Sequence, residues 1–319
     1  MSFSIKGTGS CYPEKVVTNE DLSKMVDTSD EWIYTRTGIK ERRIATHETM
    51  SELSVTAAKR AVENAGIDPG EIDLVIFSTV HGEYNTPSMA CVVSEGLGVD
   101  CPAFDLNGAC SGFLYALDVA DGFFARGKVR HILVVAAEMM SHIVDWEDRA
   151  TCVLFGDGAG AAVLSAGDDL LAIKLRGKGN SEVLQIPNYI GNSPYTELER
   201  RPTTLYMNGR EVYRFAVDAM SSGIKEVMEM ADLSPEEITW VMPHQANARI
   251  IEGAKKRLEF KDEQYVTNIE HYANVSSACI PCLLDQMNRG GKLHAGDTIA
   301  MSAFGGGLTS AAAIVRWSI

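Results

Sequence analysis

The stretch AGIDPGEIDLVI, residues 65–76, is the part of the sequence that decides the fold, because the chain repeats it. The second copy is ADLSPEEITWVM, residues 231–242, and each of its positions lies 166 residues after its counterpart (65 to 231). In both copies an Asp or Ser precedes Pro, which suits a cap and the first position of a short helical turn. A mostly apolar run follows and predicts a buried strand. The repeat indicates that one folding unit occurs twice.

The flanking sequence supports this interpretation. Apolar residues recur at three- and four-residue spacing over 51–65 and 211–231, so an amphipathic helix is expected before each copy. Further motifs also return in order: Ala116-Leu117-Asp118, Gly127-Lys128 and the apolar run 132–135 are echoed by Leu283-Leu284-Asp285, Gly291-Lys292 and 298–301. Two α/β segments that merely share a capping habit would look similar, and this alternative stays open.

The repeat predicts two similar α/β halves, residues 1–166 and 167–319. Helices that alternate with continuous apolar strands predict largely parallel sheets with both faces covered. The stretch 177–204 is rich in Asn, Pro, Gly and Arg, so we expect an irregular connection over the surface.

Composition excludes several classes of protein. The 319 residues carry a formal net charge of −14, which disfavours nucleic acid as a partner because phosphate binding needs clustered Lys and Arg. Apolar runs such as 132–137 are far shorter than the roughly 20 residues of a membrane-spanning helix. Residues 1–15 contain no apolar stretch that suits a signal peptide. We expect a cytoplasmic protein without a membrane partner.

The seven cysteines, an odd number, are expected to be reduced thiols. Cys279-Ile280-Pro281-Cys282 is formally a CxxC motif, but no second pair accompanies it, so a metal site is disfavoured. Pro281 indicates the start of a helix instead.

Cys110 stands in a run of small residues after the apolar segment 103–106. Small side chains permit a tight turn into the amphipathic helix expected over 113–124, which would place the thiol at a helix N-terminus. There the helix dipole and free backbone N–H groups favour thiolate over thiol. A lone cysteine is more often an ordinary buried thiol, and the residues alone leave both interpretations open.

Two further strand ends carry polar residues. His244 follows the apolar run 240–243, and Asn274 precedes small residues that lead into another apolar helix. An isolated His is more often structural, and an Asn at this place is usually a helix cap. Cys, His and Asn from three such turns would form a nucleophile with two polar partners, but their spacing does not show that they meet.

Two glycine clusters, FGDGAGA at 155–161 and FGGGL at 304–308, can present backbone N–H groups to an oxyanion or permit close packing. Neither has the GxGxxG spacing, and neither is followed by the Lys and Ser or Thr of a phosphate-binding loop. A nucleotide hydrolase is therefore disfavoured.

Six segments together resemble the thiolase superfamily, and most closely its β-ketoacyl-acyl-carrier-protein synthase III family. They are DEWIYTRTGI at 30–39, ACSGF at 109–113, FGDGAGA at 155–161, PHQAN at 243–247, Asn274, and FGGG at 304–307. The resemblance covers essentially the whole chain. It implies duplicated α/β halves in a five-layer α-β-α-β-α arrangement, with the nucleophile in the first half and the His and Asn in the second.

The resemblance implies a catalytic triad of Cys110, His244 and Asn274. Cys110 would accept the acyl group of an acyl-CoA primer, and the backbone N–H groups of Cys110 and Gly306 would hold the oxyanion. His244 and Asn274 would stabilise the enolate left when malonyl-acyl carrier protein loses CO₂. The product would be a 3-ketoacyl-acyl carrier protein, which initiates fatty acid synthesis, and the enzyme would be a homodimer without a metal or redox cofactor.

The family's binding sites map onto two further groups of residues. The CoA site falls on Thr28, Trp32, Arg36, Arg149, Met207, Gly209, Ala246 and Asn247. Trp32 and Arg149 can sandwich an adenine ring, and Arg36 suits a phosphate. An acidic carrier protein would bind the basic patch Arg214, Arg249, Lys256 and Arg257. Without the resemblance, a buried Trp and ordinary surface cations would be the better interpretation.

The chain departs from the family pattern at the primer pocket. Thr86 stands where acetyl-primed members have a Phe donated across the dimer, so a longer or branched primer would fit, unless Tyr84 or Met89 fills the space. Val275 replaces a common Thr, and Asn107-Gly108 replaces two alanines before the nucleophile. These differences bear on primer and pathway more than on chemistry.

Four other functions share parts of this sequence pattern. The nearest is a relative in secondary metabolism that condenses an acyl group or only transfers it. A hydroxymethylglutaryl-CoA synthase would need a general-acid Glu where Val80 stands, although Glu83 is close in sequence, and a degradative thiolase would need a second Cys in place of 304–306. A non-catalytic acyl-binding partner is the alternative from another class, and the intact Cys, His and Asn argue against it.

Overall fold

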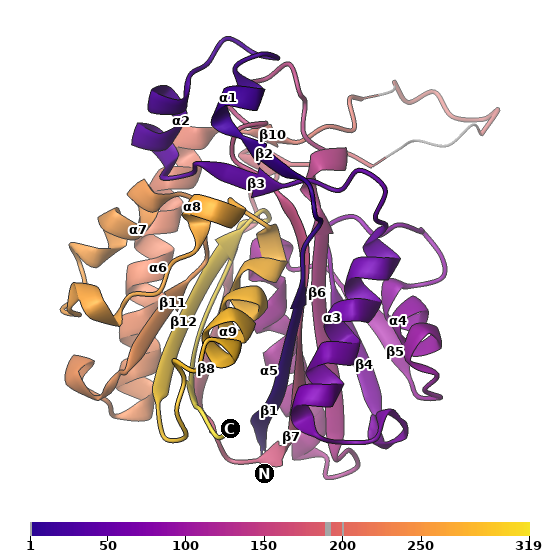
Figure 1. Ribbon diagram of the computed structural model, residues 1–319, viewed down its shortest axis with the longest axis vertical. Coiled ribbons are helices and arrows are strands. Elements are labelled where there is room, and N and C mark those ends of the chain that lie inside the picture. Colours follow the sequence, from indigo (N-terminus) through magenta and orange to yellow (C-terminus); the bar gives the residue numbers. More distant parts are fainter. Residues whose placement is uncertain (1, 189–192, 200) are drawn as a thin grey trace.

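Two sheets organise the computed structural model, which describes residues 2–188, 193–199 and 201–319 (Figure 1). The first sheet has the order β1-β7-β6-β4-β5 and the second β11-β12-β13-β8. The strands of the first are β1 Ser2–Cys11, β4 Leu74–Ser78, β5 Ala103–Leu106, β6 His131–Met139 and β7 Asp157–Gly167. Those of the second are β8 Leu170–Gly177, β11 Trp240–Pro243, β12 Thr298–Gly305 and β13 Thr309–Arg316.

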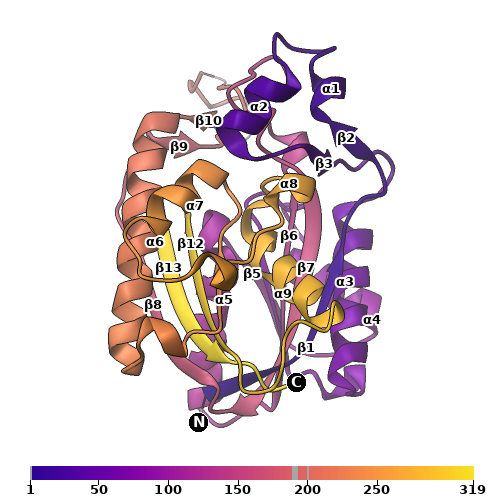
Figure 2. The ribbon, with the colours of Figure 1, turned by 60° about the vertical axis from the view of Figure 1, so that its left-hand side comes forward.

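The helices lie on both sides of these sheets and between them (Figure 2). They are α1 Asn19–Leu22, α2 Asp30–Thr37, α3 Met50–Ala65, α4 Met89–Leu97, α5 Gly112–Ala125, α6 Gly209–Ala231, α7 Ala248–Lys255, α8 Ile269–Tyr272 and α9 Cys279–Arg289. Short 3₁₀ turns are η1 Pro69–Glu71, η2 Ala109–Ser111, η3 Met140–His142, η4 Pro235–Glu237, η5 Asp262–Gln264 and η6 Ser276–Ala278. Within the described ranges, none of these helices has the length and apolar character needed to cross a membrane.

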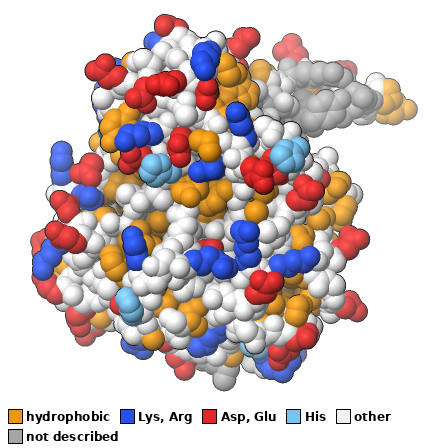
Figure 3. Space-filling view, viewed as in Figure 1, with side chains coloured by type: hydrophobic (Ala, Val, Ile, Leu, Met, Phe, Trp, Pro, Cys, Tyr) orange, Lys and Arg blue, Asp and Glu red, His pale blue; other side chains and the backbone are white. Residues whose placement is uncertain are grey.

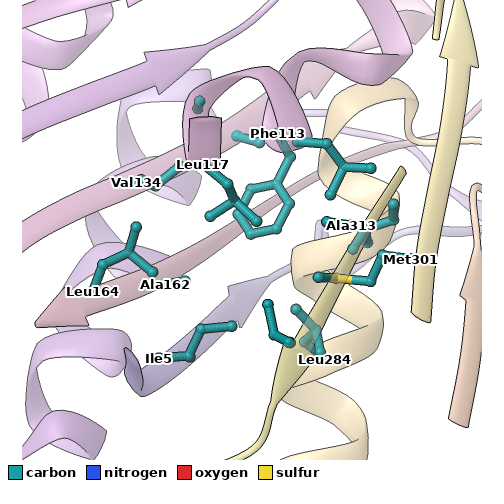
Figure 4. Close-up of a cluster of buried hydrophobic side chains, with 14 of the residues drawn as sticks. Ile5, Phe113, Leu117, Val134, Ala162, Leu164, Leu284, Met301 and Ala313 are labelled. Atoms are coloured by element: carbon teal, nitrogen blue, oxygen red, sulfur yellow. The ribbon is translucent and has the colours of Figure 1, made fainter. Parts of the chain in front are cut away.

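A central layer of two helices, α5 and α9, joins the halves. Phe113 and Leu117 of α5 and Leu284 of α9 are buried in one cluster with Val134 of the first sheet and Met301 of the second (Figure 4). Helices α3 and α4 cover the outer face of the first sheet, and α6 and α7 cover that of the second. The predicted five-layer α-β-α-β-α arrangement is confirmed.

Both copies of the repeat fold in the same way. Helices α3 and α6 end at residues in the left-handed conformation, Gly66 with φ 66° and Asp232 with φ 54°. Turns η1 and η4 follow, each with Pro at its start and a capping box from Asp68 or Ser234. Strands β4 and β11 then begin, so the sequence pattern correctly predicts helix end, turn and strand.

The sheets are mixed, so the prediction of largely parallel sheets is wrong. Strand β4 is parallel to β5 and β6, and β11 is parallel to β12, but the other four pairings are antiparallel. Helices cover both faces of the antiparallel strands too, and this makes their sequences as continuously apolar as those of parallel strands. The short connection 306–308 also forces β12 and β13 to run antiparallel.

A cap of small elements lies above one end of both sheets (Figure 1). It contains α1, α2 and two small antiparallel sheets of two strands each. One pairs β2 (Val16–Thr18) with β3 (Glu41–Arg43), and the other pairs β9 (Leu184–Gln185) with β10 (Tyr206–Met207). Strand β9 falls in the stretch 177–204, so the connection expected to be irregular contains this short strand. Positions 189–192 and 200 of that stretch lie outside the described residues.

The CxxC segment forms the first turn of α9, as Pro281 predicts. Cys279 and Cys282 are both buried there, and the Cys282 thiol donates a hydrogen bond to the carbonyl oxygen of Ala159 at 3.2 Å. These thiols pack against the first sheet.

Truncation of the central layer tests this architecture. Leu117 has no exposed surface, so Leu117→Ala is expected to lower the free energy of unfolding by about 2–5 kcal/mol in urea denaturation. The matched control is Leu198→Ala, because Leu198 is 70% exposed, and its effect should stay within about 0.5 kcal/mol. Equal effects of the two substitutions would contradict a core between the sheets.

Candidate active site

Cys110 lies at a close contact between the two halves. It occupies η2, between β5 and α5, and Ala109 before it has φ 48°. A Cβ atom on Gly305, at the end of β12, would lie 2.6 Å from the backbone nitrogen of Cys110, which only glycine permits. The next residue, Gly306, lies beside Ala109. The glycine cluster therefore allows the second half to approach the nucleophile turn.

A cavity of about 580 Å³ brings the three predicted catalytic residues together. Cys110, His244 and Asn274 all line it, as do Gly305 and Gly306. These residues come from turns in both halves of the chain. The cavity therefore supplies the proximity that spacing in the sequence does not show.

His244 follows β11, and its backbone N–H donates to the carbonyl oxygen of Ser302 in β12 at 2.8 Å. The ring is buried, meets Phe304 edge-on, and has no hydrogen-bond partner among the described residues at either nitrogen. Burial lowers the pKa of His244 from 6.5 to about 3, so the imidazole is neutral near pH 7. One ring nitrogen can therefore donate to a substrate and the other can accept.

Asn274 is fixed in position by its backbone and by its side-chain oxygen. Its N–H donates to Leu154 and its carbonyl accepts from Gly156, both at 3.0 Å. The side-chain Oδ1 accepts the backbone N–H of Ser276 at 2.8 Å and the Cys279 thiol at 3.7 Å. The amide thus does cap the turn. Its Nδ2 group has no acceptor within the described parts of the chain and can donate into the cavity.

The surroundings of Cys110 oppose ionisation of its thiol. The residue keeps some contact with the cavity, yet protein surrounds its sulfur, and burial raises the pKa of Cys110 to about 12. The hydroxyl of Ser276 opposes this shift and the Glu138 carboxylate adds to it. Burial therefore opposes the preference for thiolate that a position near the start of α5 provides.

Glu138, near the end of β6, is a site residue that the sequence analysis missed. Its Oε1 accepts hydrogen bonds from the hydroxyls of Ser276 at 3.1 Å and Ser277 at 2.7 Å. Its Oε2 accepts from the Thr79 hydroxyl and the Val80 N–H, both at 3.1 Å. Burial raises its pKa to about 7 despite these bonds. A single carboxylate inside the otherwise apolar run 132–139 was the available signal.

Most of the predicted CoA residues line the same cavity. Six of the eight line it: Trp32, Arg36, Met207, Gly209, Ala246 and Asn247. The guanidinium groups of Arg36 and Arg149 lie 4.6 and 5.2 Å from the centre of the Trp32 ring. An adenine between Trp32 and Arg149 therefore requires Arg149 to move away. Thr28 does not line the cavity, but its hydroxyl is buried without a partner in the described structure.

The predicted basic patch lines a second, wider groove of about 1140 Å³ between α6 and α7. Its four members are Arg214, Arg249, Lys256 and Arg257, and Tyr213 lines both this groove and the cavity. Arg257 pairs with Asp218 at 3.2 Å and Arg214 with Glu211 at 3.6 Å. Figure 3 shows Lys and Arg interspersed with Asp and Glu over the face it views, as expected of an acidic chain.

Thr86 is exposed and lies between β4 and α4, outside the residues that line either hollow. A role in the primer pocket requires a second copy of the chain to deliver it. The primer-pocket assignment stays a prediction, as do the oxyanion hole and the two binding sites.

Comparison with known proteins agrees with this geometry. Two family models match, 3-oxoacyl-[acyl-carrier-protein] synthase III over residues 104–179 and its C-terminal counterpart over 228–317. A β-ketoacyl-[acyl-carrier-protein] synthase III of Clostridium acetobutylicum is 47% identical over 99% of both chains. The chain belongs to the synthase III family.

Solved structures of synthase III proteins share the fold. That of 3-oxoacyl-[acyl-carrier-protein] synthase III from Aquifex aeolicus is 45% identical, with a TM-score of 0.93 over 99% of this chain and 100% of that one. The priming β-ketosynthase of the R1128 polyketide pathway is 36% identical, with a TM-score of 0.92 over 99% and 96%. Proteins named 3-oxoacyl-[acyl-carrier-protein] synthase III and a protein named for a polyketide pathway thus share this fold.

Acid unfolding tests the buried neutral imidazole. Because the pKa of His244 falls from 6.5 to about 3 on folding, its stability contribution is complete above pH 6.5 and is lost as the pH falls toward 3. In His244→Gln, the decrease in unfolding free energy between pH 7 and about pH 4 is expected to be smaller by about 3 kcal/mol. Urea denaturation at each pH measures it, with exposed His294→Gln as control. An unaltered pH dependence in His244→Gln would show that the ring is hydrated.

Proposed function

We propose that this synthase III joins an acyl-CoA primer to malonyl-acyl carrier protein by a decarboxylating Claisen condensation. The product is a 3-ketoacyl-acyl carrier protein, and the reaction initiates fatty acid synthesis through an acyl-Cys110 intermediate. The observation that carries this proposal is the convergence of Cys110, His244 and Asn274 in one cavity of a synthase III chain.

In the first half-reaction, the Cys110 sulfur loses its proton and attacks the thioester carbonyl of acyl-CoA. The backbone N–H groups of Cys110 and Gly306 hold the developing oxyanion. Support comes from the close approach of this glycine cluster to the Cys110 turn and from the position of both residues on the wall of the cavity. CoA departs as a thiolate and takes a proton from solvent.

In the second half-reaction, malonyl-acyl carrier protein enters and loses CO₂, which leaves an enolate on its thioester oxygen. An N–H of neutral His244 and the Nδ2 group of Asn274 donate hydrogen bonds to that oxygen. Neither ring nitrogen of His244 has a hydrogen-bond partner within the described structure, and a site that disfavours an imidazolium keeps the ring neutral. The enolate carbon attacks acyl-Cys110 and forms the new carbon–carbon bond. The steps move no electrons to a redox group, so we propose no cofactor.

The substrates would bind on either side of Tyr213. CoA occupies the residues around Trp32, with Arg36 toward a phosphate, and the carrier protein lies in the groove between α6 and α7. Lys256 is well suited to an acidic partner because it has no ion-pair partner in the described structure. We also propose a cytoplasmic homodimer, supported by seven free thiols and by the exposed position of Thr86.

A second candidate function is priming of a dedicated pathway in secondary metabolism. The similarity of the chain to the R1128 priming β-ketosynthase supports this second function. The two functions share the same chemistry at Cys110 and differ in the carrier protein and primer that the enzyme prefers. A non-catalytic acyl-binding role has weaker support, because the unpartnered ring of His244 is costly to bury unless a substrate uses it.

Mass spectrometry after mixing with acyl-CoA tests the nucleophile. We expect one acyl group on the peptide that contains Cys110, and none in Cys110→Ala. Exposed Cys91 supplies the control, since Cys91→Ala should retain the adduct. A panel of straight and branched acyl-CoAs would identify the primer. An adduct on another residue, or no adduct with any acyl-CoA, would overturn the proposed function.

Charge reversal tests the carrier-protein groove. Lys256→Glu is expected to raise the KM for malonyl-acyl carrier protein by about five- to tenfold, roughly 1 kcal/mol, without change in the KM for acyl-CoA. Lys292→Glu, at an exposed site after α9, makes the same change in net charge and should have no effect. Added salt should reduce the difference. Equal kinetics of the two variants would place the carrier protein elsewhere.

A further inference from the structure

A chain of hydrogen bonds connects the Cys110 thiol to the carboxylate of Glu138. The thiol donates to Oγ of Ser276 at 3.4 Å, and the Ser276 hydroxyl donates to Oε1 of Glu138 at 3.1 Å. This series of hydrogen bonds crosses the junction between the halves, because Cys110 and Glu138 belong to the first half and Ser276 belongs to the second half. The catalytic steps described above assign no role to Glu138.

The carboxylate faces neutral groups on every side described by its contacts. Thr79 and Val80 approach from the segment after β4, and Ser276 and Ser277 from η6. In β7 its register partner is Gly158. The titratable group that interacts with it is Cys110, whose pKa the carboxylate raises. No cation contributes to the shift of Glu138 in the described structure, so its affinity for a proton comes from burial.

Glu138 is a better acceptor for the thiol proton than His244. Burial raises the pKa of Glu138 to about 7, whereas burial lowers that of His244 to about 3. Protonation removes the charge of a buried carboxylate but creates a charge on a buried imidazole, so the same environment drives the two in opposite directions. The His244 ring also has no hydrogen bond to the thiol. Geometry and charge therefore agree on the acceptor.

We propose that Glu138 receives the Cys110 proton through Ser276 when the acyl-enzyme forms, and returns it when condensation releases the Cys110 sulfur. Glu138 does not touch the substrate. It acts through Ser276 and stores the proton between the two half-reactions. The inference deepens the proposed function, on which its return step rests.

Protons and bonds balance over the two half-reactions. As the Cys110 S–C bond forms and the C–S bond to CoA breaks, the thiol proton passes to Ser276 Oγ, whose own proton passes to Glu138. CoA leaves as the thiolate. Decarboxylation of the malonyl group supplies the electron pair that forms the carbon–carbon bond, and the Cys110 thiolate leaves. It recovers a proton from Ser276, which recovers its own from Glu138, so the enzyme ends as it began.

Ser276 offers a precise test because its hydroxyl can be removed without loss of its backbone contacts. Its N–H still donates to Oδ1 of Asn274 in Ser276→Ala. Ser277→Ala is the matched control, because the Ser277 hydroxyl also donates to Glu138 at 2.7 Å but has no hydrogen bond to Cys110. Glu138→Gln is a second variant that removes the acceptor, and circular dichroism would verify that it folds.

Two rates of Cys110 would be measured against pH: acylation by acyl-CoA in a single turnover, and alkylation by iodoacetamide of the peptide that contains Cys110. In the wild type both should rise through about pH 7 and then level off up to about pH 9, because the thiol itself, with a pKa of about 12, ionises only at higher pH. In Ser276→Ala and Glu138→Gln both should be about 100-fold slower near neutral pH and should continue to rise in alkali. In Ser277→Ala the midpoint should move upward, because a bond that lowers the Glu138 pKa is lost, while the plateau is kept.

The relay would be overturned if Ser276→Ala retained the wild-type rates and pH profile, or if Ser277→Ala lost the plateau as Ser276→Ala does. Should Glu138→Gln unfold, Ser276→Ala decides alone. Alkylation needs no substrate, which separates the two proposals. If the wild type is alkylated with the expected profile but takes no acyl group from any acyl-CoA, the proposed function fails and the proton path to Glu138 stands.

Discussion

Glu138 and His244 are buried at the junction of the two halves, Cys110 lines the cavity there, and no cation pairs with any of them in the described structure. Loss of hydration is therefore the largest cause of the pKa shift of each of the three groups. It favours a neutral thiol, a neutral imidazole and a carboxyl group that exchanges its proton near neutral pH. Such a site can stabilise an enolate with uncharged donors and can store one proton. The two halves of the chain together bury Glu138 and His244 at this junction.

The duplicated fold explains how a buried junction forms between the two halves. Central helices α5 and α9 are packed between the two sheets, and each begins at a 3₁₀ turn, η2 or η6, that carries site residues. The first half has Val75 of β4 paired with Ala103 of β5, whereas the second has only a bridge between Val241 and Tyr265 at the corresponding place. The copies share one topology and have diverged at their edges. Their turns meet at Cys110, where Gly305 leaves no space for a side chain.

Local chemistry in the sequence was sufficient to predict much of this structure. The caps at Asp68 and Ser234, the helix 113–124 and the strand-end positions of Cys110 and His244 follow from residue types and periodicity over short distances. Strand direction does not, since strands covered on both faces are equally apolar whether parallel or antiparallel. The Glu138 network was missed because its donors come from segments far apart in the chain. The burial of the Cys110 thiol, which raises its pKa, was not predictable because burial depends on the whole fold.

Infrared difference spectroscopy of the resting enzyme, with Glu138→Gln as reference, tests most directly whether burial at the junction raises the pKa of Glu138. Spectra between about pH 5 and pH 9 report the carbonyl stretch of a protonated carboxylic acid, and the variant assigns that band to Glu138. We predict that the wild type shows the band at low pH and loses it with a midpoint near pH 7. A Glu138 that is already ionised at pH 5, as an exposed carboxylate would be, would contradict the account.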